Sequence, residues 1–319
     1  MLLVGDWAQL SPVQAGGAFK LLADDRSPDA PTLHEVHRFT HDWERDASLQ
    51  LRLGNADVAD TYLVHGRVES GDREDLLDLL FDAWRTDTEG GRASLMLSAD
   101  AQTVSDLNGR AQAHRIRSGE VTPDGVRLEN GTIVGVGDRI VTRQNLRALA
   151  TGRGWVQNGD DWIVTDTNPD GSLTVTRLGG GVGLVLPAEY VLEHVELGYA
   201  STAYRAQGRT VDTAHAYVTA STQREPLYVM ATRGRDSNRL YVDTAYDRDQ
   251  RTDHQAVTSS DPTEVLATVI ATTGADLAAH ETRRQEQTRA LQRAVGEPRP
   301  SHLVASEKTF GPRLDLWTL

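Results

Sequence analysis

The segment Gly5-Asp6-Trp7-Ala8-Gln9 combines residue types and spacing that could do chemistry. It follows a short apolar run, Leu2-Leu3-Val4, that predicts a buried strand, and ligands of α/β folds bind beyond the carboxyl ends of such strands. From this position the side-chain amide of Gln9 could hydrogen-bond a γ-phosphate or the water that attacks it. The alternative is an ordinary strand-to-helix turn with an exposed glutamine.

Lysine is nearly absent, because only two of the 33 basic residues are Lys. A Walker A loop needs Lys followed by Ser or Thr, after glycines whose backbone N–H groups hold phosphate. Lys20 is followed by Leu21, and Lys308 is followed by Thr309 but preceded by Glu307. We therefore expect no P-loop in this sequence.

The overall composition is that of a globular protein, with 319 residues, 39% hydrophobic and 25% charged. A net charge of −13 argues against coating nucleic acid through bulk charge, but it does not exclude a local basic track. The absence of cysteine excludes disulfides, thiolate zinc sites and cysteine nucleophiles. No apolar stretch is long enough for a membrane span or a signal peptide, so we expect a cytoplasmic protein with no membrane partner.

The predicted elements alternate in a way that favours an α/β fold. Strands are expected near residues 2–4, 93–97, 213–218 and 239–242. Helices are expected from Pro12, over 42–53, up to Gly66, and over 72–84, 100–117, 226–233 and 262–294. Between residues 119 and 195 the sequence consists of short runs in which apolar and polar residues alternate, separated by Asp-Gly and Asn-Gly pairs. This pattern predicts a small inserted β-barrel or sandwich.

Three further segments fit with the first: His37-Arg38-Phe39, the run ASTAYRAQGRTVD at 200–212, and the run YVMATRGR at 228–235. In order along the chain, the four segments resemble motifs III, IV, V and VI of a superfamily 1 helicase of the RecD-like branch. Residues 137–145 and 156–160 resemble the SH3-like insertion of that branch. Residues 186–200 resemble the helicase half of conjugative relaxases of the TraA/TrwC (MobF) type. The resemblance extends from residue 2 to about residue 290.

The resemblance implies a nucleotide site shared by two RecA-like domains. In it Gln9 would sense the γ-phosphate, Arg38 and Arg233 would be arginine fingers, and Gly208 would lie beside the nucleotide. A guanidinium suits this role because it is planar, always charged and able to bind two phosphate oxygens. For Arg233 alone, a surface helix arginine is the alternative.

The resemblance also implies a single-stranded DNA track that includes Thr202, Gln207 and Tyr204. The family more often has His at position 204, where the Tyr of this sequence could instead stack on a base. Residues 139–155 contain four arginines, no acid and a tryptophan, a pattern typical of single-strand binding. A solvated basic hairpin is the alternative. From this insertion we expect DNA contacts by Arg139, Arg143, Asn145, Trp155 and Asn158.

Two other groups of residues have simpler interpretations. Arg110, His114, Arg115 and Arg117 on the helix at 100–117 are interpreted as a solvated face. His34, His37 and His41 do not have zincin spacing, so we expect no metal site.

The resemblance implies four parts: a remnant of the first RecA-like domain at 1–35, a second RecA-like domain at 36–118 and 196–250, an SH3-like β subdomain at 119–195, and a C-terminal helix and tail at 251–319. Walker A and B are missing, so we expect the C-terminal part of a helicase, inactive as an ATPase alone. ATP and Mg²⁺ would bind only with an upstream P-loop half. The expected partners are single-stranded DNA and an N-terminal relaxase or P-loop polypeptide. The alternative function is a non-catalytic single-strand-binding or structural remnant.

Overall fold

A computed structural model describes residues 4–6, 8–10, 36–151, 154–245 and 261–274, all within one compact unit that ends at Ala275. Its centre is a five-stranded parallel sheet with the strand order β1-β14-β13-β2-β12. The strands are β1 (Val68–Gly71), β14 (Gly234–Asp243), β13 (Val211–Val218), β2 (Ser94–Ser98) and β12 (Ala200–Thr202). The predicted α/β fold class is confirmed.

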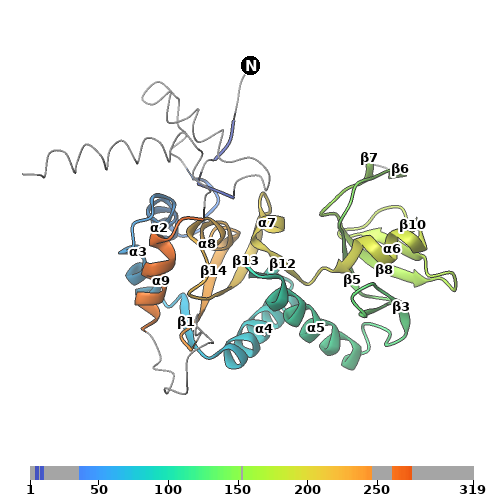
Figure 1. The fold of residues 1–319 in the computed structure, drawn as a ribbon, viewed down its shortest axis with the longest axis horizontal. Helices are drawn as coiled ribbons and strands as arrows, with labels where there is room; N and C mark the ends of the chain where they lie inside the picture. The colour runs from blue at the N-terminus through green and yellow to red at the C-terminus, as the bar shows by residue number, and fades with distance from the viewer. Residues whose placement is uncertain (1–3, 7, 11–35, 152–153, 246–260, 275–319) are drawn as a thin grey trace, which may run out of the picture. The chain divides into compact units, whose positions relative to one another are not determined.

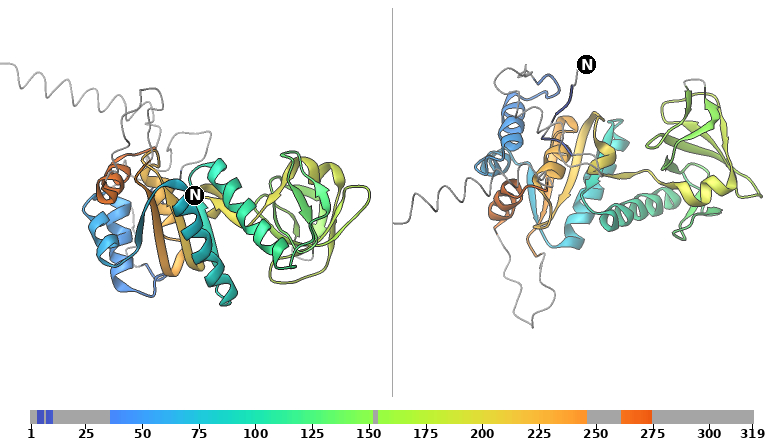
Figure 2. Two further views of the ribbon diagram at one scale, coloured as in Figure 1. Left: turned by 90° about the horizontal axis from the view of Figure 1, so that it is seen from below. Right: turned by 45° about the horizontal axis from the view of Figure 1, so that its top comes forward.

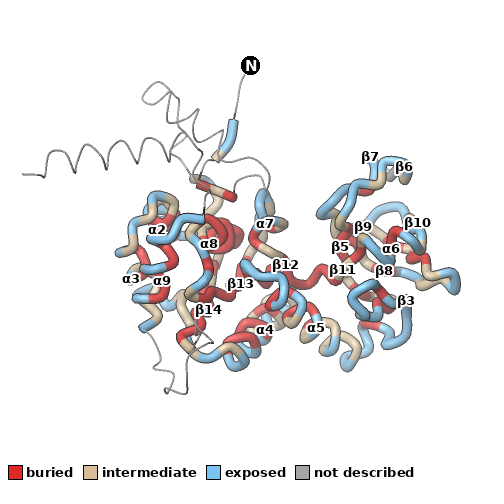
Figure 3. The backbone as a smooth tube through the Cα atoms, in the orientation of Figure 1, coloured by how far each residue is buried: buried red, intermediate tan, exposed pale blue. Residues whose placement is uncertain are grey.

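Helices cover both faces of this sheet (Figures 1 and 2). One face packs against α4 (Arg73–Glu89) and α5 (Ala101–Arg117). The other face packs against α2 (Asp42–Leu53), α3 (Val58–Val64), α8 (Arg224–Met230) and α9 (Pro262–Ala271). Parallel strands need both faces covered, and all five residues of β2 are accordingly buried. Much of the neighbouring strands β13 and β14 is likewise buried, as the red parts of the tube in Figure 3 show.

The helix boundaries follow from local capping. Asp72 and Asp100 accept hydrogen bonds from the backbone N–H groups of Asp75 and Thr103 and so begin α4 and α5. Gly54 ends α2 with a φ of 78°, a left-handed conformation that favours glycine. These signals are local, which is why the sequence predicts the elements well.

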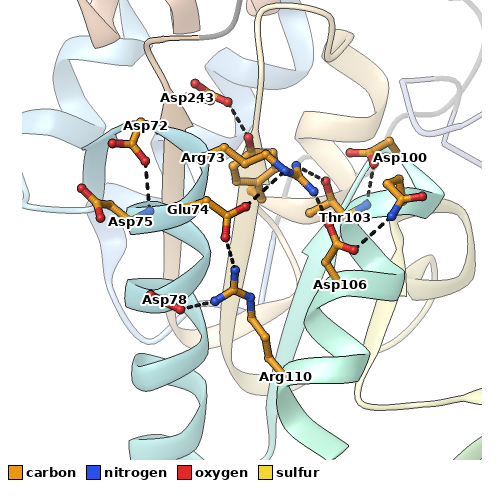
Figure 4. A network of polar contacts seen from close by, with 12 residues as sticks. Asp72, Arg73, Glu74, Asp75, Asp78, Asp100, Thr103, Asp106, Arg110 and Asp243 are labelled. Atoms are coloured by element: carbon orange, nitrogen blue, oxygen red, sulfur yellow. Dashed lines mark hydrogen bonds and ion pairs between the residues drawn. The ribbon is translucent and has the colours of Figure 1, made fainter. Parts of the chain in front are cut away.

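Polar contacts fasten α4 to α5 (Figure 4). Arg73 donates to the Thr103 hydroxyl at 2.8 Å and pairs with Asp106, and Arg110 pairs with Glu74 and Asp78. His114 and Arg115 face Glu89 and Glu120. Acids of the same chain therefore satisfy the basic side chains of α5, except Arg117, which is simply exposed.

The insertion consists mainly of β-strands, as predicted, but it also contains one short helix. Its main sheet is antiparallel, and two hairpins, β3–β4 and β6–β7, accompany it. The sheet contains β10 (Leu184–Leu186), β9 (Leu173–Arg177), β8 (Asp161–Thr167), β5 (Arg139–Thr142) and β11 (Val195–Leu197), in that order. The hairpins contain β3 (Gly125–Arg127), β4 (Ile133–Gly135), β6 (Leu146–Thr151) and β7 (Gly154–Val156), and α6 (Ala188–His194) precedes β11. An SH3-like closure of this subdomain stays a prediction.

The β subdomain and the parallel sheet meet at Gly198 and Tyr199, the two residues between β11 and β12. The Asn108 Oδ1 atom, on α5, accepts hydrogen bonds from the backbone N–H groups of Tyr199 (2.9 Å) and Ala200 (2.8 Å). The Tyr199 hydroxyl donates to buried Asp138 at 2.6 Å and accepts from the Arg139 N–H at 3.2 Å. One hydrophobic cluster continues from α4 and α5 into the β subdomain. The joint is therefore fixed by buried contacts on both sides.

Several predicted boundaries differ from the structure. The helix expected at 226–233 ends at Met230, and the strand expected at 239–242 is the ten-residue β14, so Arg233 stands between them rather than on a helix. Within the described residues the helix expected at 262–294 ends at Ala271, where Thr272 is extended, and residues 275–294 lie outside that part of the chain. Strand β1 was not expected. The strand at 2–4 and the helix from Pro12 fall outside the described residues.

None of the helices in the described residues is both long and apolar enough to span a bilayer.

We predict that Tyr199→Phe lowers the free energy of unfolding by about 2 kcal/mol, because Asp138 and the Arg139 N–H each lose a buried partner. Urea denaturation measures the change. Tyr204→Phe is the matched control, since Tyr204 is 53% exposed, and should be neutral within about 0.5 kcal/mol. Equal effects of the two substitutions would contradict the role given to the Tyr199 hydroxyl.

Candidate functional site

Arg233 is the centre of one group of predicted site residues. Although charged, it is only 1% exposed. Its guanidinium donates to the carbonyl oxygens of Val229 (2.8 Å), Arg209 (3.3 Å) and Ala206 (3.4 Å), and to the Thr232 hydroxyl (2.9 Å). All these acceptors are neutral, so they satisfy the N–H groups without neutralising the charge.

Arg38 lies beside Arg233. Its Nη1 atom donates to the Thr232 carbonyl, and its segment is held against the start of β14 because the Thr40 N–H donates to the Arg235 carbonyl at 2.8 Å. Burial, and then the nearby charge of Arg38, lowers the pKa of Arg233 to about 10. Within the described residues, neither arginine forms an ion pair with a carboxylate. Two close guanidiniums without a carboxylate partner make a site suited to an anion.

Gln9 reaches this region through Asp6. The Gln9 amide donates to Asp6 Oδ2 at 3.1 Å, and the Tyr228 hydroxyl, from α8, donates to the same oxygen at 3.3 Å. Arg52, from α2, pairs with Asp6 Oδ1 at 3.0 Å. Leu10 is buried in the same hydrophobic cluster as α2 and α8. The segment predicted to sense phosphate is thus fastened to the helix that precedes Arg233.

Gly208 belongs to the turn held by Arg233, since the carbonyls of Ala206 and Arg209 on either side of it accept from that guanidinium. Its φ is 84°, and a Cβ built there meets no atom within 4 Å. Glycine is therefore required by backbone conformation rather than by crowding. This region brings together the predicted nucleotide residues, although Gln9 and Arg233 are 224 positions apart in the sequence.

The second group of predicted residues includes the β6–β7 hairpin. Trp155 is 40% exposed, and the Arg147 guanidinium lies 5.5 Å from the centre of its ring. Asn158 and Asn145 are exposed at the base of the hairpin, where the Asn158 N–H donates to Asn145 Oδ1 at 3.0 Å. This arrangement offers an exposed aromatic face, a neighbouring cation and polar groups.

Arg139 is placed differently from the other predicted DNA residues. Its side chain is mostly buried and faces Asp161 at 3.5 Å, which also accepts from Arg209 at 2.9 Å. Burial lowers the pKa of Arg139. Asp161 thereby links Arg139 of β5 to Arg209 in the turn before β13, and a DNA contact by Arg139 stays a prediction.

A pocket of about 820 Å³ brings Arg143 and Thr202 together. It also includes Arg205 and Glu196, which the sequence analysis did not select. Glu196 accepts from Arg143 at one carboxylate oxygen and from Arg205, at 2.9 Å, at the other. Arg205 follows Tyr204 in the quoted motif, so its position was a signal that could have found it.

Thr202 caps α7 (Ala203–Ala206) by accepting from the Arg205 N–H at 3.5 Å. Tyr204 and Gln207 are exposed on and just after this short helix. They present side chains to solvent next to the pocket rim. His37 and His41 belong to no cluster of three potential metal ligands among the described residues, and His34 lies outside them.

The chain is similar to one family model and to several known proteins. A profile of the AAA domain family matches residues 1–73. The conjugal transfer proteins TraA of Sinorhizobium fredii (probable) and Agrobacterium fabrum are each 30% identical over 251 residues, 76% of this chain and 22% of the relative. This chain thus spans about a fifth of the length of those relatives. Uncharacterized protein Rv2311 of Mycobacterium tuberculosis is 34% identical over 126 residues, 38% of this chain and 70% of that protein.

Solved structures of Pif1 helicases are also similar. Bacteroides Pif1 bound to ssDNA has 16% identity and a TM-score of 0.46, covering 88% of this chain and 66% of its own. The Bacteroides complex with ADP-AlF3 and ssDNA has 16% identity and a TM-score of 0.44, covering 89% and 66%.

We predict that Asp6→Ala speeds hydrogen exchange at the Ala8 and Gln9 amides at least about tenfold, because their segment loses its contacts to Arg52 and Tyr228. Mass spectrometry of the amino-terminal peptide measures the rate. Asp57→Ala is the control, since that side chain makes no helix-capping hydrogen bond. Unchanged exchange in Asp6→Ala would show that Asp6 does not hold the segment.

Proposed function

Because this chain belongs to the same family as Rv2311 and is a relative of the TraA conjugal transfer proteins over three quarters of its length, we propose that it is the C-terminal helicase portion of an ATP-dependent DNA translocase. In this proposal its parallel sheet is the second RecA-like domain. It supplies arginine fingers to a nucleotide and a track to single-stranded DNA during conjugative transfer.

One observation supports the nucleotide role above the others: buried Arg233 and half-buried Arg38 lie together, and neither forms an ion pair with a carboxylate among the described residues. The charge of the nearby Asp6 carboxylate offsets only part of the lowering of the Arg233 pKa. Burying a cation is unfavourable unless an opposite charge compensates it. A polyphosphate arriving from outside the chain would provide that charge. We propose that Gln9, Arg38, Gly208 and Arg233 contact the nucleotide, the two arginines acting on the transferred phosphoryl group.

Exposed groups on two elements support the DNA role. Arg147 over Trp155 on the β6–β7 hairpin offers a base-stacking surface, and Tyr204 on α7 offers a second aromatic ring. Further hydrogen bonds to this track would come from four polar residues, Asn145, Asn158, Thr202 and Gln207. Arg143 would also contribute if it left its ion pair with Glu196 and bound a phosphate of the strand. Arg139 would support this track indirectly, because its ion pair with Asp161 helps to hold the β subdomain in place.

We further propose that the ATP–Mg²⁺ complex is bound for hydrolysis only when a polypeptide with Walker A and B sequences completes the site, whereas the arginine pair alone binds a polyphosphate weakly. The 319-residue chain alone should hydrolyse no ATP, because neither of its lysines stands in a Walker A sequence. A relaxase or P-loop polypeptide is the proposed partner. The second candidate function, single-strand binding without catalysis, shares the same DNA surface but predicts no nucleotide-dependent role for Arg233.

We predict that Trp155→Ala combined with Arg147→Ser weakens binding of a labelled single-stranded oligonucleotide by about tenfold, because a stacking surface and its cation are lost. Fluorescence anisotropy at two salt concentrations measures affinity and its salt dependence. The control is Leu192→Ala, an exposed apolar residue outside the hairpin. Unchanged affinity in the double variant, or affinity independent of salt, would contradict the proposed track.

We also predict that tripolyphosphate at about ten times its Kd raises the melting temperature by roughly 2–4 °C, since it would bind only the folded arginine pair. Arg38→Met should remove at least half of that shift. Arg235→Met is the matched control, because Arg235 is exposed and pairs with Asp212. An identical shift in Arg38→Met and the unchanged chain would place the anion elsewhere.

A further inference from the structure

The pocket beside α7 is separate from the nucleotide residues described above. Its walls come from α5, the β3–β4 hairpin, the joint around β11 and the start of α7. Its volume of about 820 Å³ lies within the range of sites that hold small organic ligands. Hydroxyl and amide side chains, including Ser105, Asn108 and Thr132, alternate on its walls with apolar ones, including Val104 and Ile133. Such a lining suits a flat, polar-edged group.

Two arginines stand at one end of this pocket. Arg143 comes from the end of β5 and Arg205 from α7, and both pair with the single carboxylate of Glu196. The three side chains together carry one excess positive charge. The Glu196 carboxylate lies between two guanidiniums, a position that a phosphate group could share or take.

Hydrogen-bond donors without partners line the same pocket. Asn108 is 6% exposed, and its Oδ1 atom accepts from two backbone N–H groups, which fixes the orientation of the amide. Its Nδ2 atom therefore remains a donor, with no hydrogen bond to any described residue. The buried Nη1 atom of Arg205 also has no hydrogen-bond partner among the described residues. Of these two donors the Arg205 Nη1 atom is buried, whereas the Asn108 Nδ2 atom is accessible and can donate to an acceptor oxygen or nitrogen of a ligand.

We propose that this pocket receives one nucleotide of the bound single strand, turned out of line with its neighbours. The phosphate lies at Arg143 and Arg205, and the base lies between α5 and the β3–β4 hairpin, where Asn108 donates to an acceptor on its edge. Glu196 competes with the phosphate for both arginines. The proposal rests on the single-strand-binding function and adds a specific subsite to it.

Gly109 provides the test, because it lines the pocket and a Cβ built there meets nothing within 4 Å. Gly109→Phe should fill the pocket without disturbing the packing of α5. Gly109→Ala is the matched control, since it makes the same change of backbone freedom but leaves the volume open. The probes are a labelled oligothymidylate and an abasic oligomer of equal length, with affinities measured by anisotropy on the full chain.

The unchanged chain and Gly109→Ala should bind the oligothymidylate about tenfold more tightly than the abasic oligomer through this subsite. Gly109→Phe should reduce that preference to about two- to threefold, leaving abasic binding unaffected. Arg205→Met should weaken binding of both probes, and Glu196→Gln should strengthen both. A 2-aminopurine base in the strand should gain fluorescence on binding, and Gly109→Phe should abolish the gain.

Other outcomes would overturn the proposal in distinguishable ways. If the unchanged chain binds neither probe, the proposed function and the subsite fail together. If it binds both but Gly109→Phe acts on them equally or on neither, only the subsite fails. If free thymidine monophosphate binds saturably in a Gly109→Phe-sensitive way while the strand does not, the pocket serves a free nucleotide.

Discussion

The two-residue joint between β11 and β12 is the constraint on which the rest of the structure depends. The chain leaves the antiparallel sheet at Leu197 and returns to the parallel sheet at Ala200, so only Gly198 and Tyr199 connect the two sheets at this point. Gly198 lies against the Ile140 backbone, where a Cβ would come within 3.1 Å of a carbonyl carbon, and Asn108 accepts from the two amides that follow it. With the chain held this closely, the β subdomain and the parallel sheet share one hydrophobic cluster.

Charge position explains how an acidic chain can offer anion sites. On α5, Arg110 pairs with two acids and Arg115 with one, whereas Arg143 and Arg205 share Glu196, and Arg139 and Arg209 share Asp161. At the start of β14, Arg38 and Arg233 are held by neutral oxygens. A local excess of positive charge thus remains at the joint and at the nucleotide residues despite the net charge of −13. Association with phosphates depends on these local excesses rather than on the sum.

The sequence predicted most of the fold because its signals are local: aspartate caps, Gly54, and Asn-Gly and Asp-Gly turns. It misplaced Arg233 on a helix, because the end of α8 is set by the long-range pairing of β14 with β13. The sequence also did not predict which basic side chains are exposed to solvent. Arg139 reads as a basic residue of an acid-free run, yet Asp161 and Arg209, distant in sequence, enclose it. Arg205 and Glu196 were passed over because their shared contact joins two elements that only the fold brings together.

The buried contacts at this joint make the β subdomain and the parallel sheet one body. Hydrogen exchange of the Tyr199 and Ala200 amides, followed against urea, tests it most directly. We expect both amides to exchange only by global unfolding, with the same free energy and denaturant dependence as the buried amides of β13. Exchange through a local opening, with a lower free energy and little dependence on urea, would contradict it.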